Sequence, residues 1–233
     1  MARQSRLDRT VVSLLDNGSK LQSPAVDKYV ERLRRAHPDE SPAQIIERIE
    51  HLFLNSVTGS GAAVGATAAV PAIGTVATLA AAGAETVFFL EASALMTLAV
   101  ASVHGIHPAD HEQRRALVLA VALGDSGAAI MARTLGKTNK TWVNAIGGKI
   151  PGIKSVNETL LRKFVTQYAA KRSALLLGKI VPAGIGAVIG SVGNRAIGKK
   201  TIEHARSTFG PAPTTWPNRP PGNVVNLRPA IEA

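Results

Sequence analysis

Residues 124–127, Gly-Asp-Ser-Gly, contain the residue types that come closest to a catalytic motif in this chain. A serine in this setting could be the nucleophile of a trypsin-like protease, if a histidine and an acid activated it on a β-barrel. No strand pattern surrounds the segment, and a four-residue match has little specificity. We therefore expect it to break or cap a helix.

Two glycine patterns could hold a phosphate group. Gly136-Lys137-Thr138 ends like a P-loop, but Met131 stands where the first glycine of that motif belongs. Residues 59–65 have the look of a nucleotide-binding glycine turn, with Glu85 about twenty residues later. Such turns follow a β-strand, and no strand pattern precedes either segment. No cofactor is predicted.

Three histidines are close enough in sequence to suggest a metal site: His104, His107 and His111. Pro108 separates the first two from the next helix, and no glutamate completes a zinc-protease pattern. We expect loop histidines and predict no metal. The chain has no cysteine, which excludes disulfides, thiol nucleophiles and cysteine-ligated metal centres.

Glu91 and Lys179 are isolated charges within apolar sequence. Each would be costly to bury alone. They could form a substrate or ion site, but mutual pairing or a reach to the interface is the favoured interpretation. Because no nucleophile or acid–base constellation emerges, we predict a protein without catalytic residues.

The net charge of +11 is concentrated in the second half of the chain. Residues 1–112 contain 9 Lys/Arg and 12 Asp/Glu, whereas residues 113–233 contain 18 Lys/Arg and 4 Asp/Glu. This asymmetry indicates a surface that meets phosphate groups of lipid or nucleic acid. The alternative is a solvated basic face that maintains solubility. The candidate residues for binding an anionic surface are Arg133, Lys137, Lys140, Lys149, Lys154, Arg162, Lys163, Lys199 and Lys200.

Helical periodicity dominates and no sustained period-2 alternation occurs, so the predicted fold is an all-α bundle of about seven or eight helices. Residues 1–22 lack a long apolar region, and we expect a flexible segment there with no secretory signal. Residues 23–209 form the predicted helical domain. Residues 210–233 contain six prolines, which predicts a disordered tail.

Serine–proline pairs at 23–24 and 41–42 predict two helix starts. His37-Pro38 is expected to end the first of these helices. The second helix carries an apolar stripe at helical spacing, formed by Ile45, Ile46, Ile49, Leu52 and Phe53.

Other boundaries are predicted further along the chain. Residues 107–110 indicate a turn and a helix start. Ser155 and Glu158 have the spacing of a capping box. Asn194-Arg195 predicts the end of an uncharged segment, with a short basic helix following at 197–209.

Three stretches, 57–84, 86–103 and 180–193, are nearly free of charge, and the first and last consist mainly of small residues. We expect these two to pack against each other and against 86–103. Small residues four apart let helix backbones approach closely, in a membrane or in a soluble bundle. Residues 57–104 are long enough for a membrane hairpin, although Ala and Gly favour insertion only weakly. The candidate packing positions are Gly61, Gly65, Gly186 and Gly190.

Three groups of residues occur in an order shared with a known family. The first is Ser41 to Ile46, leading into the glycine-rich segment 58–65. The second is the apolar helix that ends at Val103-His104-Gly105, followed by Pro108. The third is 180–190, Ile-Val-Pro-Ala-Gly-Ile-Gly-Ala-Val-Ile-Gly, followed by Asn194 and by His204-Ala205-Arg206. Over residues 23–209 the chain resembles the bacterial EcsC family.

The resemblance implies a helical protein at the cytoplasmic side of the bacterial inner membrane, peripheral or inserted as a hairpin, with no established catalytic residues. We therefore predict a membrane-associated accessory or structural protein, with anionic lipid or a membrane protein as its partner. The alternative is a soluble helical protein that binds nucleic acid through its basic half. Aromatic residues make up only 4% of the chain, which disfavours base stacking.

Overall fold

The computed structural model describes residues 23–67, 75–137, 142–148, 150–177 and 185–217. Within these ranges the chain forms seven α-helices, one short 3-10 helix and no strand, which confirms the all-α prediction. The elements are α2 (Ser23–Ala36), α3 (Pro42–Thr67), α4 (Thr75–Val103), α5 (His111–Leu123), α6 (Asp125–Leu135), η1 (Trp142–Ala145), α7 (Ile153–Leu177) and α8 (Ile185–Phe209).

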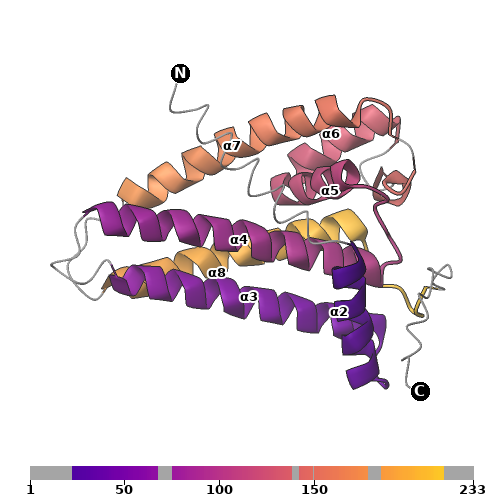
Figure 1. Ribbon diagram of the computed structural model, residues 1–233, viewed down its shortest axis with the longest axis horizontal. Coiled ribbons are helices and arrows are strands. Elements are labelled where there is room, and N and C mark those ends of the chain that lie inside the picture. Colours follow the sequence, from indigo (N-terminus) through magenta and orange to yellow (C-terminus); the bar gives the residue numbers. More distant parts are fainter. Residues whose placement is uncertain (1–22, 68–74, 138–141, 149, 178–184, 218–233) are drawn as a thin grey trace, which may run out of the picture.

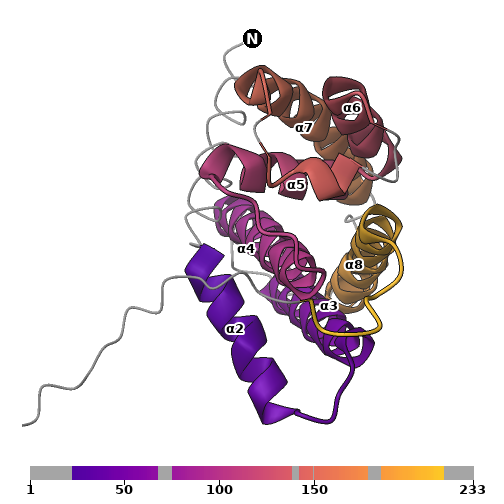
Figure 2. The same ribbon diagram turned by 90° about the vertical axis from the view of Figure 1, so that its right-hand side faces the viewer.

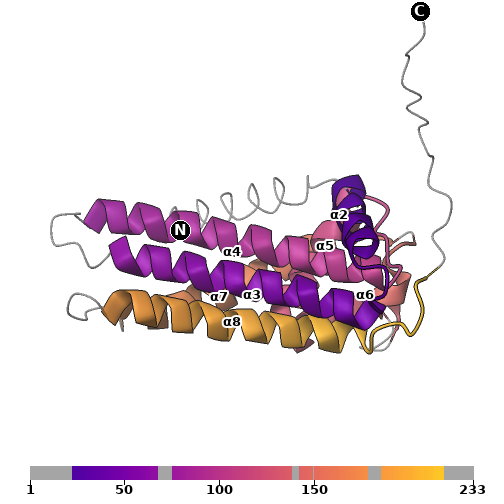
Figure 3. The ribbon, with the colours of Figure 1, turned by 90° about the horizontal axis from the view of Figure 1, so that it is seen from below.

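The helices form two layers. The long helices α3, α4 and α8 lie side by side, and α2 crosses one end of this layer (Figures 1 and 3). Helices α5, α6 and α7 form the second layer (Figure 2). Helix α5 joins the layers, because it contacts α4 and α8 on one side and α6 and α7 on the other.

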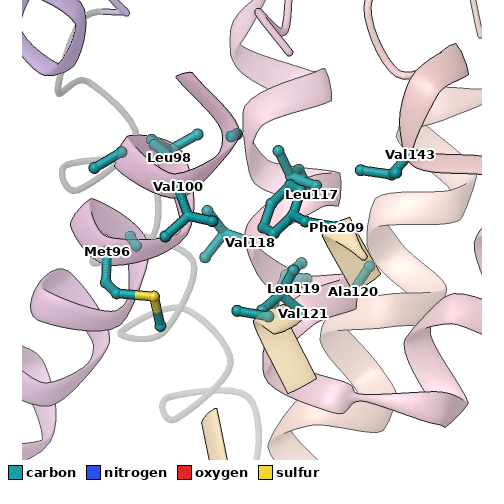
Figure 4. Close-up of a cluster of buried hydrophobic side chains, with 14 of the residues drawn as sticks. Met96, Leu98, Val100, Leu117, Val118, Leu119, Ala120, Val121, Val143 and Phe209 are labelled. Atoms are coloured by element: carbon teal, nitrogen blue, oxygen red, sulfur yellow. The ribbon is translucent and has the colours of Figure 1, made fainter. Parts of the chain in front are cut away.

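The hydrophobic core is centred on α5. All six residues from Ala116 to Val121 are buried. In Figure 4 the side chains of Leu117 and Val118 lie between Val100 of α4 and Phe209 at the end of α8. The uninterrupted apolar sequence of α5 is therefore explained by burial on all sides.

Helices α3 and α8 make the most extensive helix–helix contact in the described part of the chain. The Nδ2 group of Asn194 donates to the Val57 carbonyl at 3.0 Å, and one turn later Gly198 faces Val57. The guanidinium of Arg206 donates from Nε to both carboxylate oxygens of Glu50, at 2.9 and 3.2 Å. This hydrogen bonding raises the pKa of Arg206 above its ordinary value. Because the contacts run in opposite directions along the two chains, the helices are antiparallel.

The predicted segment 57–84 is divided between α3, which ends at Thr67, and α4, which begins at Thr75, while 185–193 belongs to α8; these three helices contact one another. Gly61 is buried. The surroundings of the other three packing positions, Gly65, Gly186 and Gly190, lie outside the described residues. In the part of the chain that is described, no helix has the length and hydropathy needed to cross a membrane.

Three predicted boundaries are confirmed by their hydrogen bonds. The Ser41 N–H donates to Gln44 Oε1 at 2.8 Å while the Gln44 N–H donates to Ser41 Oγ at 3.4 Å, a reciprocal cap at the start of α3. Asp110 Oδ1 accepts from the Gln113 N–H at 2.8 Å and caps α5. Gly124 ends α5 with φ of +60°, so the segment 124–127 is a helix junction.

Three other local predictions are wrong. Helix α7 begins at Ile153, so Ser155 lies in its first turn and does not cap it. Asn194-Arg195 does not end a helix: α8 is continuous through these residues, and the Asn194 amide donates to the Val57 carbonyl of α3. Leu52, assigned to the apolar stripe of α3, does not join the core and is 56% exposed.

Part of the predicted disordered tail, residues 210–217, is placed by the structure. Residues 210–217 are described and run alongside the domain, where Trp216 packs against the core and lies under the Arg34 guanidinium at 4.8 Å from the ring centroid. Pro217 lies against Gly105. The disorder expected for 218–233 and the flexible segment expected for 1–22 fall outside the described residues.

Candidate functional site

An apolar groove of about 440 Å³ lies between α2, α3 and α4. Ile49, Phe53 and Met96 are buried beneath it. At its rim three large apolar side chains are exposed to solvent: Leu52 to 56%, Phe88 to 41% and Leu95 to 41%. Only one other large apolar residue in the described chain, Val192 on α8, is exposed. The exposed apolar surface is therefore gathered at this groove.

The α2 wall of the groove is held by specific contacts. Val26 is buried against the core. Asp27 Oδ1 accepts a hydrogen bond from Ser102 Oγ at 2.6 Å and lies 3.4 Å from His107 Nδ1. These contacts connect α2 to the end of α4 and to the loop that follows it, so the groove has a fixed outer wall.

The polar groups of the groove are few. The Ser56 hydroxyl donates to the Leu52 carbonyl of its own helix at 2.8 Å. Burial raises the pKa of Tyr29, because the phenolate would be poorly solvated. Glu91 stands in the α4 wall and, among the described residues, pairs with no cation. Its suggested partner Lys179 lies outside the described residues. The groove thus offers an apolar surface with one carboxylate.

The candidate basic residues are distributed over α6, α7, α8 and the connections between them. In the described part of the chain, none of the seven that the structure places forms an ion pair with a carboxylate. By contrast, Arg35 and Arg48 in the first half are paired with Glu31 and Glu40. Lys140 and Lys149 lie outside the described residues. The seven exposed cations are Arg133, Lys137, Lys154, Arg162, Lys163, Lys199 and Lys200.

The histidines do not converge on a metal site within the described residues. His104 stacks on Phe209, with ring centroids 5.4 Å apart and planes 25° apart. His107 faces Asp27 at the end of α2, and His111 opens α5. These three histidines therefore lie around the connection between α4 and α5, where they make different contacts.

His104 is expected to make folding sensitive to mild acid. Burial lowers the pKa of His104 in the folded protein, so the unfolded chain binds a proton more readily and the free energy of unfolding falls as pH drops through about 6.5. Urea unfolding of His104→Gln should therefore show a weaker loss of stability between about pH 7.5 and 5.5 than the parent protein does. His51→Gln, at an exposed position on α3, is the matched control. Equal pH dependence in all three proteins would refute the assignment.

Over the described residues the chain belongs to the all-α class of folds. No family model, curated protein or solved structure matches it significantly.

The exposed rim of the groove was not anticipated from sequence. Leu52 lies at the edge of the α3 apolar stripe, and this edge position was the available signal. Phe88 and Leu95 lie three positions before and four positions after Glu91, so they share its side of α4, and the isolated charge of Glu91 was the available signal.

Proposed function

We propose that this is a non-catalytic helical protein that associates peripherally with an anionic membrane surface through α6, α7 and α8. The observation that carries the proposal is the set of seven exposed cations without carboxylate partners in the described chain. Unpaired Lys/Arg side chains near an anionic leaflet each contribute about 1 kcal/mol to binding.

The resemblance to the EcsC family supports the same environment and is part of the proposal, as is a location at the cytoplasmic side of the bacterial inner membrane. Residues of the second and third groups make packing contacts within the domain: His204 lies against Gly124, Arg206 bonds Glu50, and His104 stacks on Phe209.

Nucleic acid is the less favoured anionic partner. Phe164 and Phe209, the aromatic residues described on α7 and α8, are buried. Among the side chains described on these helices, no exposed aromatic ring lies beside the cations as a platform for stacking single-stranded bases. Phosphate attraction alone would give salt-sensitive binding without sequence preference.

Flotation with vesicles tests the proposal. The variant Arg162→Gln/Lys163→Gln/Lys199→Gln/Lys200→Gln is expected to bind phosphatidylcholine–phosphatidylglycerol vesicles up to about a thousandfold more weakly than the parent protein, because four surface cations are lost. The parent protein should not bind vesicles of phosphatidylcholine alone, and added salt should weaken its binding to the mixed vesicles.

The matched control removes the same charge from the other half of the molecule, in Lys28→Gln/Arg32→Gln/Arg35→Gln/Arg48→Gln. It should retain most of the vesicle binding. Equal losses in both variants would show that net charge acts without a defined surface. Absence of binding by the parent protein, or its release from vesicles by an equal phosphate concentration of duplex DNA, would reject the membrane proposal in favour of another anionic partner.

A further inference from the structure

The groove between α2, α3 and α4 lacks a partner in the described chain. Its rim residues Leu52, Phe88 and Leu95 are exposed, and contiguous exposed apolar surface of this kind marks an interaction site. Along α4 the groove extends from Phe88 to Ala99, about 16 Å at the rise of an α-helix. An occupant must therefore be an apolar element of about this length.

The sequence of residues 1–22 has the required pattern. At helical spacing, Leu7, Val11, Leu14 and Leu15 share one face. A helix with this pattern would present one apolar face to the groove.

The same segment also has the required charge and reach. It carries Arg3, Arg6 and Arg9, and the groove holds the carboxylate of Glu91, which pairs with no cation in the described residues. The segment joins α2 at Ser23, two residues before Ala25 in the groove wall. As a helix, residues 3–15 would extend about 20 Å, longer than the groove, and Asp16-Asn17-Gly18 provide turn residues before α2.

We propose that residues 1–22 dock as an amphipathic helix in this groove, with their apolar face on Leu52, Phe88 and Leu95 and their arginines close to Glu91. The segment thereby covers the exposed apolar rim. Docking within one chain is favoured over docking of a second molecule, because the direct connection to α2 gives the segment a high effective concentration at the groove.

Single engineered thiols test the docking, because the chain has no cysteine of its own. In the full chain, Leu95→Cys is expected to react with a maleimide about tenfold more slowly than Val192→Cys, since a docked segment shields only the groove. Val192 is the matched control, being an exposed apolar residue on α8. Adding Leu7→Asp, Val11→Asp and Leu14→Asp should raise the rate at Leu95→Cys and leave the rate at Val192→Cys unchanged.

A cross-link identifies the occupant. The double variant Val11→Cys/Leu95→Cys should be joined by a short bis-maleimide into a product of monomer mass, whereas Val11→Cys/Val192→Cys should not. This result is independent of whether the triple aspartate variant folds. A product of dimer mass would assign the groove to a second copy, and protection of Leu95→Cys only in the presence of vesicles would assign it to lipid. Either outcome, or equal reactivity of the two thiols in the full chain, overturns the proposal.

Discussion

Gly127→Ala is expected to lower the free energy of unfolding by about 3 kcal/mol, the upper end of the usual cost of overpacking. A Cβ atom at Gly127 would lie 2.3 Å from the Ala120 carbonyl oxygen and 2.6 Å from the Ala120 Cα. These are backbone atoms of the buried helix α5, so no side chain can rotate to relieve the clash. Helix α6 would have to move away from α5.

The measurement is urea unfolding followed by circular dichroism, with Gly59→Ala as the control. Gly59 is an exposed position inside α3 with no atom near its missing Cβ, and alanine there should stabilise the helix by about 1 kcal/mol. The same substitution therefore has opposite signs at the two sites. If both variants are stabilised, the close approach of α5 and α6 at Gly127 is incorrect.

Arg206→Met is expected to lower the free energy of unfolding by about 2 kcal/mol. Glu50 is only 2% exposed, and removing one member of a buried pair leaves a charge without compensation, at a cost of about 3–5 kcal/mol. The Arg206 side chain is itself 61% exposed, so water reaches the vacated site and reduces the loss to about 2 kcal/mol.

A second substitution separates this effect from lost packing. In the Arg206→Met background, Glu50→Gln removes the uncompensated charge and should restore about half of the lost stability. Arg48→Met, which breaks the exposed pair of Arg48 with Glu40, should have a smaller effect than Arg206→Met. If Glu50→Gln worsens the Arg206→Met variant, the carboxylate gains its stability from a partner other than Arg206.

Boundaries with local causes could be predicted from the sequence. The caps at Ser41 and Asp110 involve side chains and backbone groups three residues apart, and Gly124 ends a helix through its own positive φ. The all-α class follows from helical periodicity along most of the chain. In each case the residues that determine the structure are neighbours in sequence.

Features with distant partners could not be predicted in this way. Asn194 indicates a helix end by its type, yet its amide finds a carbonyl of α3 that lies 137 residues earlier. Trp216 stands among prolines, and it packs against the core and under the Arg34 guanidinium of α2. Glu91 indicates the side of α4 that carries Phe88 and Leu95, but nothing in the α4 sequence specifies that α2 packs beside that side to form the groove.

The pairing of α3 with α8 has a consequence for synthesis of the protein. The residues that meet at Val57 and Asn194 are 137 positions apart, and a ribosome adding about 5–20 residues per second needs about 7–30 s to make the intervening chain. Throughout that interval the side of α3 that receives α8 has no partner, although its apolar residues are already made. This face of α3 therefore stays exposed on the nascent chain until α8 has been made.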